Sequence, residues 1–399
     1  MASTGENAGR RVLIIVENLP VPFDRRVWSE ATALRDAGYQ VSIICPKGKD
    51  ATKSFEILDN IHVYRHPLPL EARGFLGYLA EYGSALLWEF YLSIKVFRQR
   101  GFDVIHACNP PDLIFLIGAF YKFFFGKHFV FDHHDINPEL YEAKFGHREF
   151  GWKAMVWLER RSFQLADVSI ATNQSYREIA ITRGGMSPER VFVVRSGPNL
   201  DRVRSRPADP VWRNGRAFLV AYVGVIGHQE GLDLLLEAAA HIRATHGRHD
   251  IQFAIVGSGP ELATVKALSN KNNLDDMITF AGRLDDNTLF TVLSTADVCV
   301  NPDRPNTMND KSTMNKIMEY MAMGKPIVQF DLTEGRYSAG DASLYARDSA
   351  DFGDKIITLL DNPHERQTMG DFGRKRVAEE LAWPHEIPKL LAAYKTILP

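Results

Sequence analysis

The sequence predicts an α/β protein with two doubly wound, Rossmann-like domains, each built on a mostly parallel sheet. Short runs rich in Val, Ile and Phe alternate with segments of helical periodicity, as in parallel strands joined by crossover helices. The alternation stops once, in a polar stretch rich in Pro and Gly near the middle, and then starts again. The length of 399 residues fits two domains of roughly 100–200 residues each.

The first half begins with an apolar strand at residues 11–17, followed by a helix that Asp24 is expected to cap. Val27, Ala31 and Leu34 give this helix an apolar stripe, and Gly38 is expected to end it. Further strands are predicted at 40–45, 62–65, 103–107, 128–131 and 191–194.

The second half repeats the pattern after the polar stretch. Strands are predicted at 218–225, 252–256, 277–281, 298–301 and 326–330, with helices at 232–242 and 314–323. The predicted parts are a first domain at 1–197, a linker at 198–216, a second domain at 217–380 and a C-terminal helix at 381–399. This last helix is expected to kink at Trp383-Pro384 and to pack on the first domain.

Composition excludes some partners. The net charge of −2 gives no electrostatic reason to expect nucleic acid. The three cysteines, Cys45, Cys108 and Cys299, fit buried thiols in a reducing compartment. The most hydrophobic segment, 113–125, is shorter than the ~20 residues of a membrane span. It predicts a core helix, with contact to a membrane surface as the alternative, and the expected location is the cytoplasm.

The helix at 314–323 carries the clearest chemical signal. Its buried stripe has helical spacing: Met314, Ile317, Met318 and Met321. Asn315 and Lys316 fall in the first turn, where the helix end is itself positive. Lys316 is unfavourable there unless an anion such as a diphosphate binds. Glu319, one turn further on, suits the hydroxyls of a ribose; a solvated helix face is the alternative.

The run NKIMEYMAMGKPIV at 315–328 resembles the donor-binding helix of GT-B glycosyltransferases, in particular the retaining enzymes of family 4. Other segments agree in the same order: ADVSI at 166–170, RSG at 195–197, IVGSGPE at 255–261, TFAG at 279–282 and ADV at 296–298. The resemblance covers nearly the whole chain. It implies a GT-B fold, with the donor sugar held between two domains, and a metal-independent transfer with retention.

On the donor side, the resemblance implies that Glu319 binds the ribose. A second family glutamate is replaced here by Lys311, so the neighbouring Asp310 is the candidate for the sugar contact. The usual phosphate-binding Arg and Lys correspond to Val225 and Glu230, so Lys316 becomes the first candidate cation. The remaining donor-side candidates are Gly227, His228, Gly257, Gly259, Gly282, Arg283 and Asn315.

In the first domain, His134-Asp135 resembles the family's His-Asp pair, whose histidine lies against the donor sugar. A structural histidine is the alternative. A metal shared by His133, His134 and Asp135 is not expected, because neighbouring residues of an extended chain point to opposite faces. Asn109 follows another strand and is expected to line the same cleft.

Arg25 and Arg26 begin the first helix, where they could meet an anion or a hydroxyl-rich acceptor. A salt bridge with Asp24 or Glu30 is the alternative. Together with His228, these arginines are further candidates for neutralising the phosphates.

The function expected from all this is hexosyl transfer, in EC class 2.4, from a nucleotide sugar to a glycan or lipid-linked acceptor. The setting would be the biosynthesis of cell-surface polysaccharide or glycolipid, in the cytoplasm or at the inner face of the membrane. His134, Asp310 and Lys316 are the predicted catalytic residues, with neither metal nor other cofactor. A sugar-nucleotide epimerase and a non-catalytic nucleotide-sugar-binding protein are the alternatives. A dinucleotide oxidoreductase is disfavoured, since no GxGxxG follows the first strand.

Overall fold

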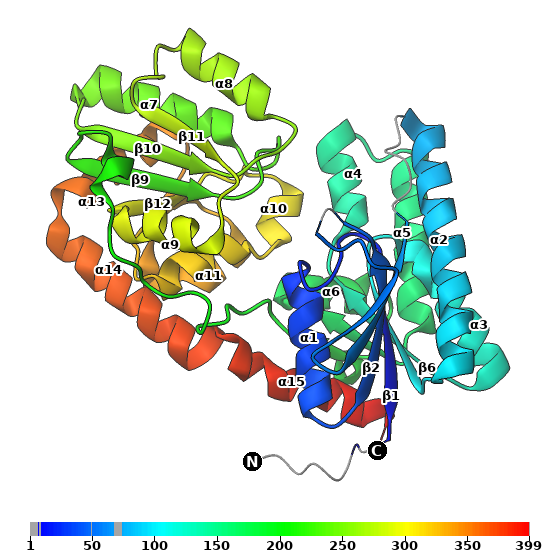
Figure 1. Cartoon of the computed structure of the whole chain (residues 1–399). Helices are drawn as coiled ribbons and strands as arrows, with labels where there is room; N and C mark the ends of the chain where they lie inside the picture. Colours follow the sequence, from blue (N-terminus) through cyan, green and yellow to red (C-terminus); the bar gives the residue numbers. More distant parts are fainter. Residues whose placement is uncertain (1–6, 8, 49, 68–73, 399) are drawn as a thin grey trace. The chain divides into compact units, whose positions relative to one another are not determined.

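The computed structural model describes residue 7 and residues 9–48, 50–67 and 74–398, with only the backbone described for 74–82 (Figure 1). The chain divides into two compact units. Unit 1 holds Met1–Ser196 together with Glu386–Pro399, and unit 2 holds Gly197–His385.

Unit 1 is built on an eight-stranded sheet in the order β3-β4-β2-β1-β5-β6-β7-β8. Every described pairing in it is parallel except that of β3 with β4. The strands are β1 Arg11–Val16, β2 Gln40–Pro46, β3 Phe55–Leu58, β4 Ile61–His66, β5 Val104–Cys108, β6 His128–His133, β7 Val168–Ala171 and β8 Val191–Val193. The predicted parallel, doubly wound sheet is confirmed, and two strands, β7 and the edge strand β3, lie outside the predicted set.

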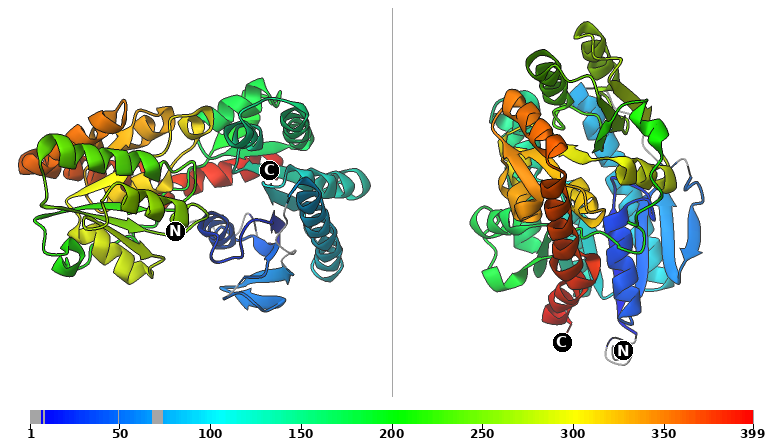
Figure 2. Two further views of the ribbon diagram at one scale, coloured as in Figure 1. Left: turned by 90° about the horizontal axis from the view of Figure 1, so that it is seen from above. Right: turned by 90° about the vertical axis from the view of Figure 1, so that its left-hand side faces the viewer.

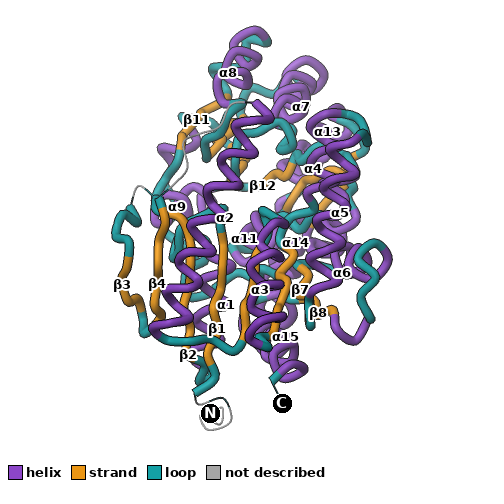
Figure 3. Tube along the Cα trace, turned by 90° about the vertical axis from the view of Figure 1, so that its right-hand side faces the viewer, coloured by secondary structure: helices purple, strands orange, loops and turns teal. Residues whose placement is uncertain are grey.

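Helices cover both faces of this sheet. They are α1 Arg25–Asp36, α2 Gly74–Gln99, α3 Phe115–Phe125, α4 Asn137–Phe145, α5 Phe150–Leu165, α6 Gln174–Thr182 and α15 Trp383–Ile397. The helices α2, α3 and α5 lie over one face, and α1 lies over the other (Figures 1 and 3). Asp24 caps α1 as predicted, since its carboxylate accepts a hydrogen bond of 3.1 Å from the N–H of Val27.

The helix of the hydrophobic segment 113–125 buries one of its faces in the core and exposes the other. Ile117 and Tyr121 of α3 are buried, whereas Phe123 and Phe124 are 78% and 74% exposed. The helix is apolar almost all round, so the sequence alone does not show which part of it faces water. Among the described residues, no helix combines the length and apolarity needed to cross a bilayer.

Unit 2 has a six-stranded parallel sheet in the order β11-β10-β9-β12-β13-β14. Its strands are β9 Phe218–Val223, β10 Ile251–Val256, β11 Ile278–Gly282, β12 Val298–Asn301, β13 Ile327–Phe330 and β14 Ser343–Ala346. Its helices are α7 Leu232–His246, α8 Leu262–Lys271, α9 Asp286–Thr295, α10 Thr307–Lys311, α11 Asn315–Ala322, α12 Thr333–Ala339, α13 Ser349–Asp361 and α14 Pro363–Arg376. Only β14 among these strands lies outside the predicted set.

The predicted linker, 198–216, packs as part of unit 2. Val203 is buried in one of its core clusters, and Arg213 forms an ion pair of 2.7 Å with Asp297. Polar composition concealed this packing, because the segment is attached mainly through arginine side chains rather than an apolar stripe.

The expected kink at Trp383-Pro384 is instead the start of a helix. Pro384 sits in the first turn of α15, where its missing N–H costs no helical hydrogen bond. From Glu386 onward, this helix, coloured red in Figures 1 and 2, belongs to unit 1.

A buried acid in α2 should make the stability of the protein depend on pH. The side chain of Glu89 is fully buried, and neither of its carboxylate oxygens has a hydrogen-bond partner among the residues that the structure describes. Burial, reinforced by the charge of Glu17, raises the pKa of Glu89 well above 4.5. The protonated acid therefore favours folding fully below about pH 4.5, and this contribution is lost as pH rises toward the folded-state pKa.

Glu89→Gln removes this titration at nearly constant volume. We expect the melting temperature of the variant, relative to the parent, to be higher by a few degrees at pH 8 than at pH 5. Thermal unfolding across this range measures the difference, with the exposed Glu178→Gln as control. A difference independent of pH would show that Glu89 does not titrate in this way.

Candidate functional site

The predicted site residues fall into two groups, one at the carboxyl ends of each sheet, where ligands of open α/β sheets bind. In unit 2, the loops after β9 and β10 pack tightly through their glycines. A Cβ on Gly257 would lie 1.8 Å from the carbonyl oxygen of Gly224, and one on Gly259 would lie 2.4 Å from that of Ile226. Gly282 adopts φ +68°, which favours glycine.

Three backbone N–H groups of these loops are bonded within the fold. The N–H of Gly224 donates to Val256 at 3.0 Å, that of Ile226 to Ser258 at 3.1 Å, and that of Gly257 to Gly282 at 2.9 Å. The glycines Gly224 and Gly257 thus allow the two loops to touch.

Lys316 lies in the first turn of α11, and its charge is met by an acid that the sequence analysis missed. Its Nζ is 2.9 Å from Oδ1 of Asp303 and 4.8 Å from the ring centre of Tyr222. Burial by itself lowers the pKa of Lys316, but Asp303 and Tyr222 outweigh it, so the pKa is raised and the ammonium stays charged. The anion that the helix start demanded is thus supplied by the chain. Asp303 follows β12, and this position after a strand was its only signal.

A second carboxylate, Glu230, approaches the same lysine. Its Oε2 lies 2.6 Å from where a Cβ of Gly227 would be, and the backbone of Gly227 contributes a hydrogen bond to it. Burial raises the pKa of Glu230, Lys316 lowers it and Asp303 raises it, with a net rise. Lys316 is therefore the cation of a cluster that also contains the carboxylates of Asp303 and Glu230.

Glu319 lies one turn after Lys316 and is held by Arg202. Its Oε1 is 3.0 Å from Nη1 of Arg202, whose Nε is 2.6 Å from Asp286. The guanidinium also lies over the ring of Phe290 at 5.1 Å. The Glu319 side chain is 17% exposed, so the carboxylate is oriented by its partner and still reaches the surface.

The other donor-side candidates differ in whether their side chains are bonded within the fold or exposed. Asp310 does not point freely outward: its Oδ1 accepts a hydrogen bond of 2.8 Å from the N–H of Thr333, at the start of α12. Asn315, His228 and Arg283 are exposed at the same end of the sheet. Unit 2 thus brings together the glycine loops, Lys316 and Glu319, and it binds Asp310 to a neighbouring helix.

In unit 1, the site is organised around Asp132, which the sequence analysis also missed. This buried carboxylate, at the end of β6, lies 2.8 Å from Nη2 of Arg26 and 2.5 Å from Nε2 of His134. His106 approaches it at 3.3 Å. Burial alone would raise the pKa of Asp132, but Arg26 and His134 outweigh it and hold the pKa well below 3.8.

Arg26 is an internal ion-pair partner and is not exposed to an acceptor or phosphate. Its side chain is 8% exposed, lies 2.9 Å from Glu30 and 2.8 Å from Asp132, and donates to the carbonyl of Val194 at 2.9 Å. The salt bridge with Glu30, the alternative left open by the sequence, is present. Arg25, the preceding residue of the helix, is exposed. One residue of helical rotation separates the two side chains.

His134 is the outermost member of a hydrogen-bonded series that starts in α15. The hydroxyl of Tyr394 lies 2.8 Å from Nδ1 of His106, whose Nε2 faces Asp132, and Asp132 faces His134. Burial lowers the pKa of His106 in spite of Asp132, which favours a neutral ring. The side chain of His134 is 14% exposed. Asp132 therefore holds the buried side of its ring, while part of the ring reaches solvent.

Asn109 positions the loop that carries His134 and Asp135. Its Oδ1 accepts hydrogen bonds from the N–H of His134 at 2.7 Å and of Asp135 at 3.2 Å, and its Nδ2 donates to Asp112. Only 2% of Asn109 is exposed, so it supports the loop rather than lining a cleft as expected. Burial raises the pKa of Asp135, which is partly exposed.

Metal-ligating side chains also meet in the described part of the chain. His133 faces Glu159 at 3.2 Å, away from His134, as the extended backbone predicted. Three groups have atoms close enough for one ion: His106, Cys108 and Asp132; Glu30, Asp132 and His134; His241, His246 and Asp354. The first two share Asp132, whose charge Arg26 already neutralises.

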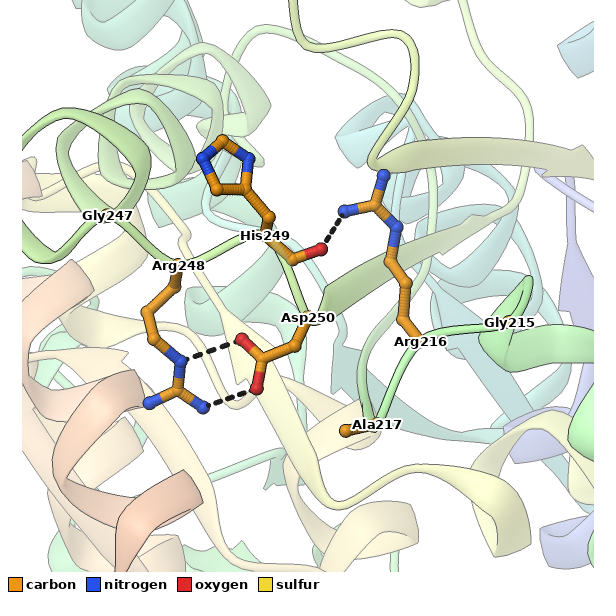
Figure 4. A pocket seen from close by; sticks show the side chains of 7 residues that line it. All are labelled: Gly215, Arg216, Ala217, Gly247, Arg248, His249 and Asp250. Atoms are coloured by element: carbon orange, nitrogen blue, oxygen red, sulfur yellow. Dashed lines mark hydrogen bonds and ion pairs between the residues drawn. The ribbon is translucent and has the colours of Figure 1, made fainter.

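Two hollows lie away from these groups. One, of about 530 Å³, opens at the amino ends of β9 and β10 (Figure 4). Its Arg248 is bonded to Asp250 at 2.7 Å, and its Arg216 donates to the carbonyl of His249 at 2.7 Å. This end of the sheet is opposite the strand-end site, and its arginines are engaged. The other hollow, of about 420 Å³, is lined by Ser84, Leu87, Trp88 and Tyr91 of α2.

Comparison with known proteins matches both halves of the chain. The model described as "Glycosyltransferase Family 4" matches residues 24–202, and the one described as "Glycosyl transferases group 1" matches residues 217–362. The alpha-maltose-1-phosphate synthase of Mycolicibacterium smegmatis is 26% identical over 311 residues, which cover 71% of this chain and 76% of that protein.

Two solved structures share the fold over almost the full length. Sucrose-phosphate synthase from Thermosynechococcus elongatus has a TM-score of 0.80 at 20% identity, covering 97% of this chain and 99% of that one. HepE from Anabaena, in complex with UDP and glucose, has a TM-score of 0.74 at 13% identity, covering 97% and 100%.

Proposed function

The chain belongs to the family 4 and group 1 glycosyltransferases with a GT-B fold, and from this premise we propose that it moves a hexosyl group from a nucleotide-diphosphate donor to a hydroxyl acceptor with retention. The observation that carries the proposal is α11. It places Lys316 and Glu319 one turn apart at the carboxyl end of the unit 2 sheet. The UDP and glucose bound to the similar HepE structure support a donor of this class.

Each group then has a distinct task. Glu319 accepts hydrogen bonds from the ribose hydroxyls, and Lys316 stabilises the departing diphosphate. His134 orients the sugar, and Asp310 is the candidate for a contact to it. No metal or further cofactor is part of the proposal.

Retention follows from attack on the face that the diphosphate leaves. The bond between the anomeric carbon and the phosphate oxygen breaks, and the bond to the acceptor oxygen forms on the same face. The leaving phosphate accepts the proton of the acceptor hydroxyl. Exclusion of water protects the activated sugar from hydrolysis.

The phosphate end departs from the usual charge arrangement. Lys316 is paired with Asp303, and Glu230 stands where the family has a cation. A diphosphate must therefore compete with Asp303 for the ammonium. His228 and Arg25, both exposed, are the next candidate cations.

The proposed acceptor is a glycan or a lipid-linked glycan, in the synthesis of cell-surface polysaccharide or glycolipid. The exposed phenylalanines of α3 favour the lipid-linked form. The proposed location is the cytoplasm, at the inner face of the membrane.

Thermal unfolding in the presence of a panel of nucleotide-diphosphate sugars tests the donor class. A ligand at 100 times its Kd stabilises the folded state by about 2.7 kcal/mol, or several degrees for units of this size. We expect one donor to stand out and its parent nucleoside, which lacks the diphosphate, to have little effect. A panel that leaves the melting temperature unchanged would contradict the proposal.

The same donor separates the alternatives. An epimerase of this fold releases a new nucleotide sugar without acceptor, whereas a non-catalytic protein binds the donor and returns it unchanged. A transferase releases nucleoside diphosphate only as acceptor is glycosylated, apart from slow hydrolysis. NMR of the donor with and without glycan acceptors distinguishes these outcomes.

A further inference from the structure

Exposed apolar side chains gather on one layer of unit 1. Of the nineteen large hydrophobic residues exposed in the described chain, fifteen are in unit 1 and nine lie on three of its helices. These nine define the α2–α3–α5 face: Leu87, Trp88, Tyr91, Leu116, Phe123, Phe124, Phe125, Phe150 and Trp157. Single exposed hydrophobic residues are ordinary, but a concentration of them marks an interaction surface.

The three helices form one continuous layer. Phe90 and Phe97 of α2 pack edge-to-face against Phe120 and Phe125 of α3, with ring centres 5.1 Å and 4.8 Å apart. On the other side of α3, the Nζ of Lys122 donates to the carbonyl at the end of α5, at 2.7 Å. Figure 3 shows α2, α3 and α5 side by side across the same face of the sheet. Their outward side chains therefore share one surface.

Among the described side chains of the three helices, the exposed charges have a single sign. Over the described side chains of α2, α3 and α5, the acids are Glu89 and Glu159, and both are fully buried. The cations are exposed or partly exposed: Lys95, Arg98, Lys122, Lys153, Arg160 and Arg161. Lys122 is paired with Asp167, which lies just beyond α5. Helix α13 of unit 2, by contrast, carries Asp351, Asp354 and Lys355 together.

The combination of exposed apolar residues and cations favours one kind of partner over others. Two copies of the face would repel each other through their cations. The core of a protein interface is depleted of charge and of lysine, whereas here cations alternate with apolar residues along the same helices. An anionic lipid surface suits both components, because apolar and aromatic side chains enter the headgroup boundary while Lys and Arg reach the phosphates.

We propose that the α2–α3–α5 face binds the surface of an anionic lipid bilayer. The phenylalanines at the end of α3 and Trp88 and Tyr91 of α2 enter the interface, and the cations contact lipid phosphates. The inference deepens the proposed function by naming the surface through which a lipid-linked acceptor is approached. It nevertheless rests on observations in unit 1 that are independent of the donor site.

Co-sedimentation of the full chain with lipid vesicles tests the surface. We expect at least tenfold stronger partitioning onto phosphatidylcholine–phosphatidylglycerol vesicles than onto phosphatidylcholine alone, and a loss of this preference at high salt. Phe123→Ser with Phe124→Ser should lower partitioning by roughly tenfold or more. Lys153→Gln with Arg160→Gln and Arg161→Gln should remove most of the preference for anionic lipid.

The matched control is Val211→Ser with Tyr337→Ser, which removes two exposed apolar residues of unit 2 and should leave partitioning unchanged. Three results would overturn the inference: absence of vesicle binding, equal binding to both lipid compositions, or undiminished binding of the phenylalanine variant. A dimer in solution that the phenylalanine variant abolishes would assign the face to a second copy instead.

Donor binding is read separately, by thermal shift on the same variants. If vesicles bind and no nucleotide sugar does, the proposed function fails and the surface stands. If a nucleotide sugar binds and vesicles do not, only the inference about the surface fails. The phenylalanine variant should retain the parent's donor-induced shift, since its changes lie in unit 1 on the outer side of α3.

Discussion

Replacing Glu319 by alanine is expected to weaken donor binding by about 100-fold, without unfolding the protein. Two hydrogen bonds from ribose hydroxyls to a charged carboxylate contribute about 1.5–3 kcal/mol each, and the lower end of that range already gives this factor. The fold should survive, because Arg202 keeps its second partner, Asp286, at 2.6 Å. Calorimetric titration with the donor measures the loss directly.

Asp286→Ala is the matched control. Each variant deprives Arg202 of one of its two carboxylates, but only Glu319 is assigned to the ribose. Equal losses of donor affinity in the two variants would show that Arg202, rather than Glu319, is the residue on which binding depends. Unchanged affinity in Glu319→Ala would remove the ribose assignment.

Lys316→Ala is expected to lower turnover by more than tenfold and also to destabilise unit 2. The rate falls because the leaving diphosphate loses its nearest cation, as in other sites where a positioned charge stabilises a leaving group. Stability falls because Asp303, which is 1% exposed, is left buried and charged without its partner. Loss of one partner of a buried ion pair typically costs about 3–5 kcal/mol.

The double variant Lys316→Ala with Asp303→Asn separates these two effects. Removing both charges should restore most of the melting temperature, because no buried charge is left without a partner. Turnover should remain low, since the diphosphate still lacks its cation. Recovery of turnover together with stability would mean that Lys316 acts only through the fold, and that another cation meets the phosphates.

The strands were predictable because their signal is local. Parallel strands covered on both faces read as unbroken apolar runs, and β1, β2, β10 and β12 lie within one residue of their predicted bounds. Asp24 could be identified as a cap because it acts on an N–H only three residues away. The exposed edge strand β3 has an alternating burial pattern and was not recognised, since it lacks such a run.

The charge partners could not be read in the same way, because the residues that neutralise each other are far apart in the sequence. Arg26 meets Asp132 across more than a hundred residues, and Glu319 meets Arg202 across a similar separation. A single sequence shows which residues carry charge, but not which of them will be brought together. Lys316 was recognised as needing an anion, and only the fold shows that Asp303 provides it.

The return of the chain to unit 1 at Glu386 has a consequence for synthesis. Unit 2 is one uninterrupted segment, whereas unit 1 is completed by residues that are synthesised after unit 2. Until they arrive, His106 lacks the hydroxyl of Tyr394, and the N–H of Arg195 lacks the buried carboxylate of Glu386. Most of unit 1 is therefore synthesised before unit 2 but can complete its fold only after unit 2 has been made, and a fragment ending at Ser196 would not reproduce it.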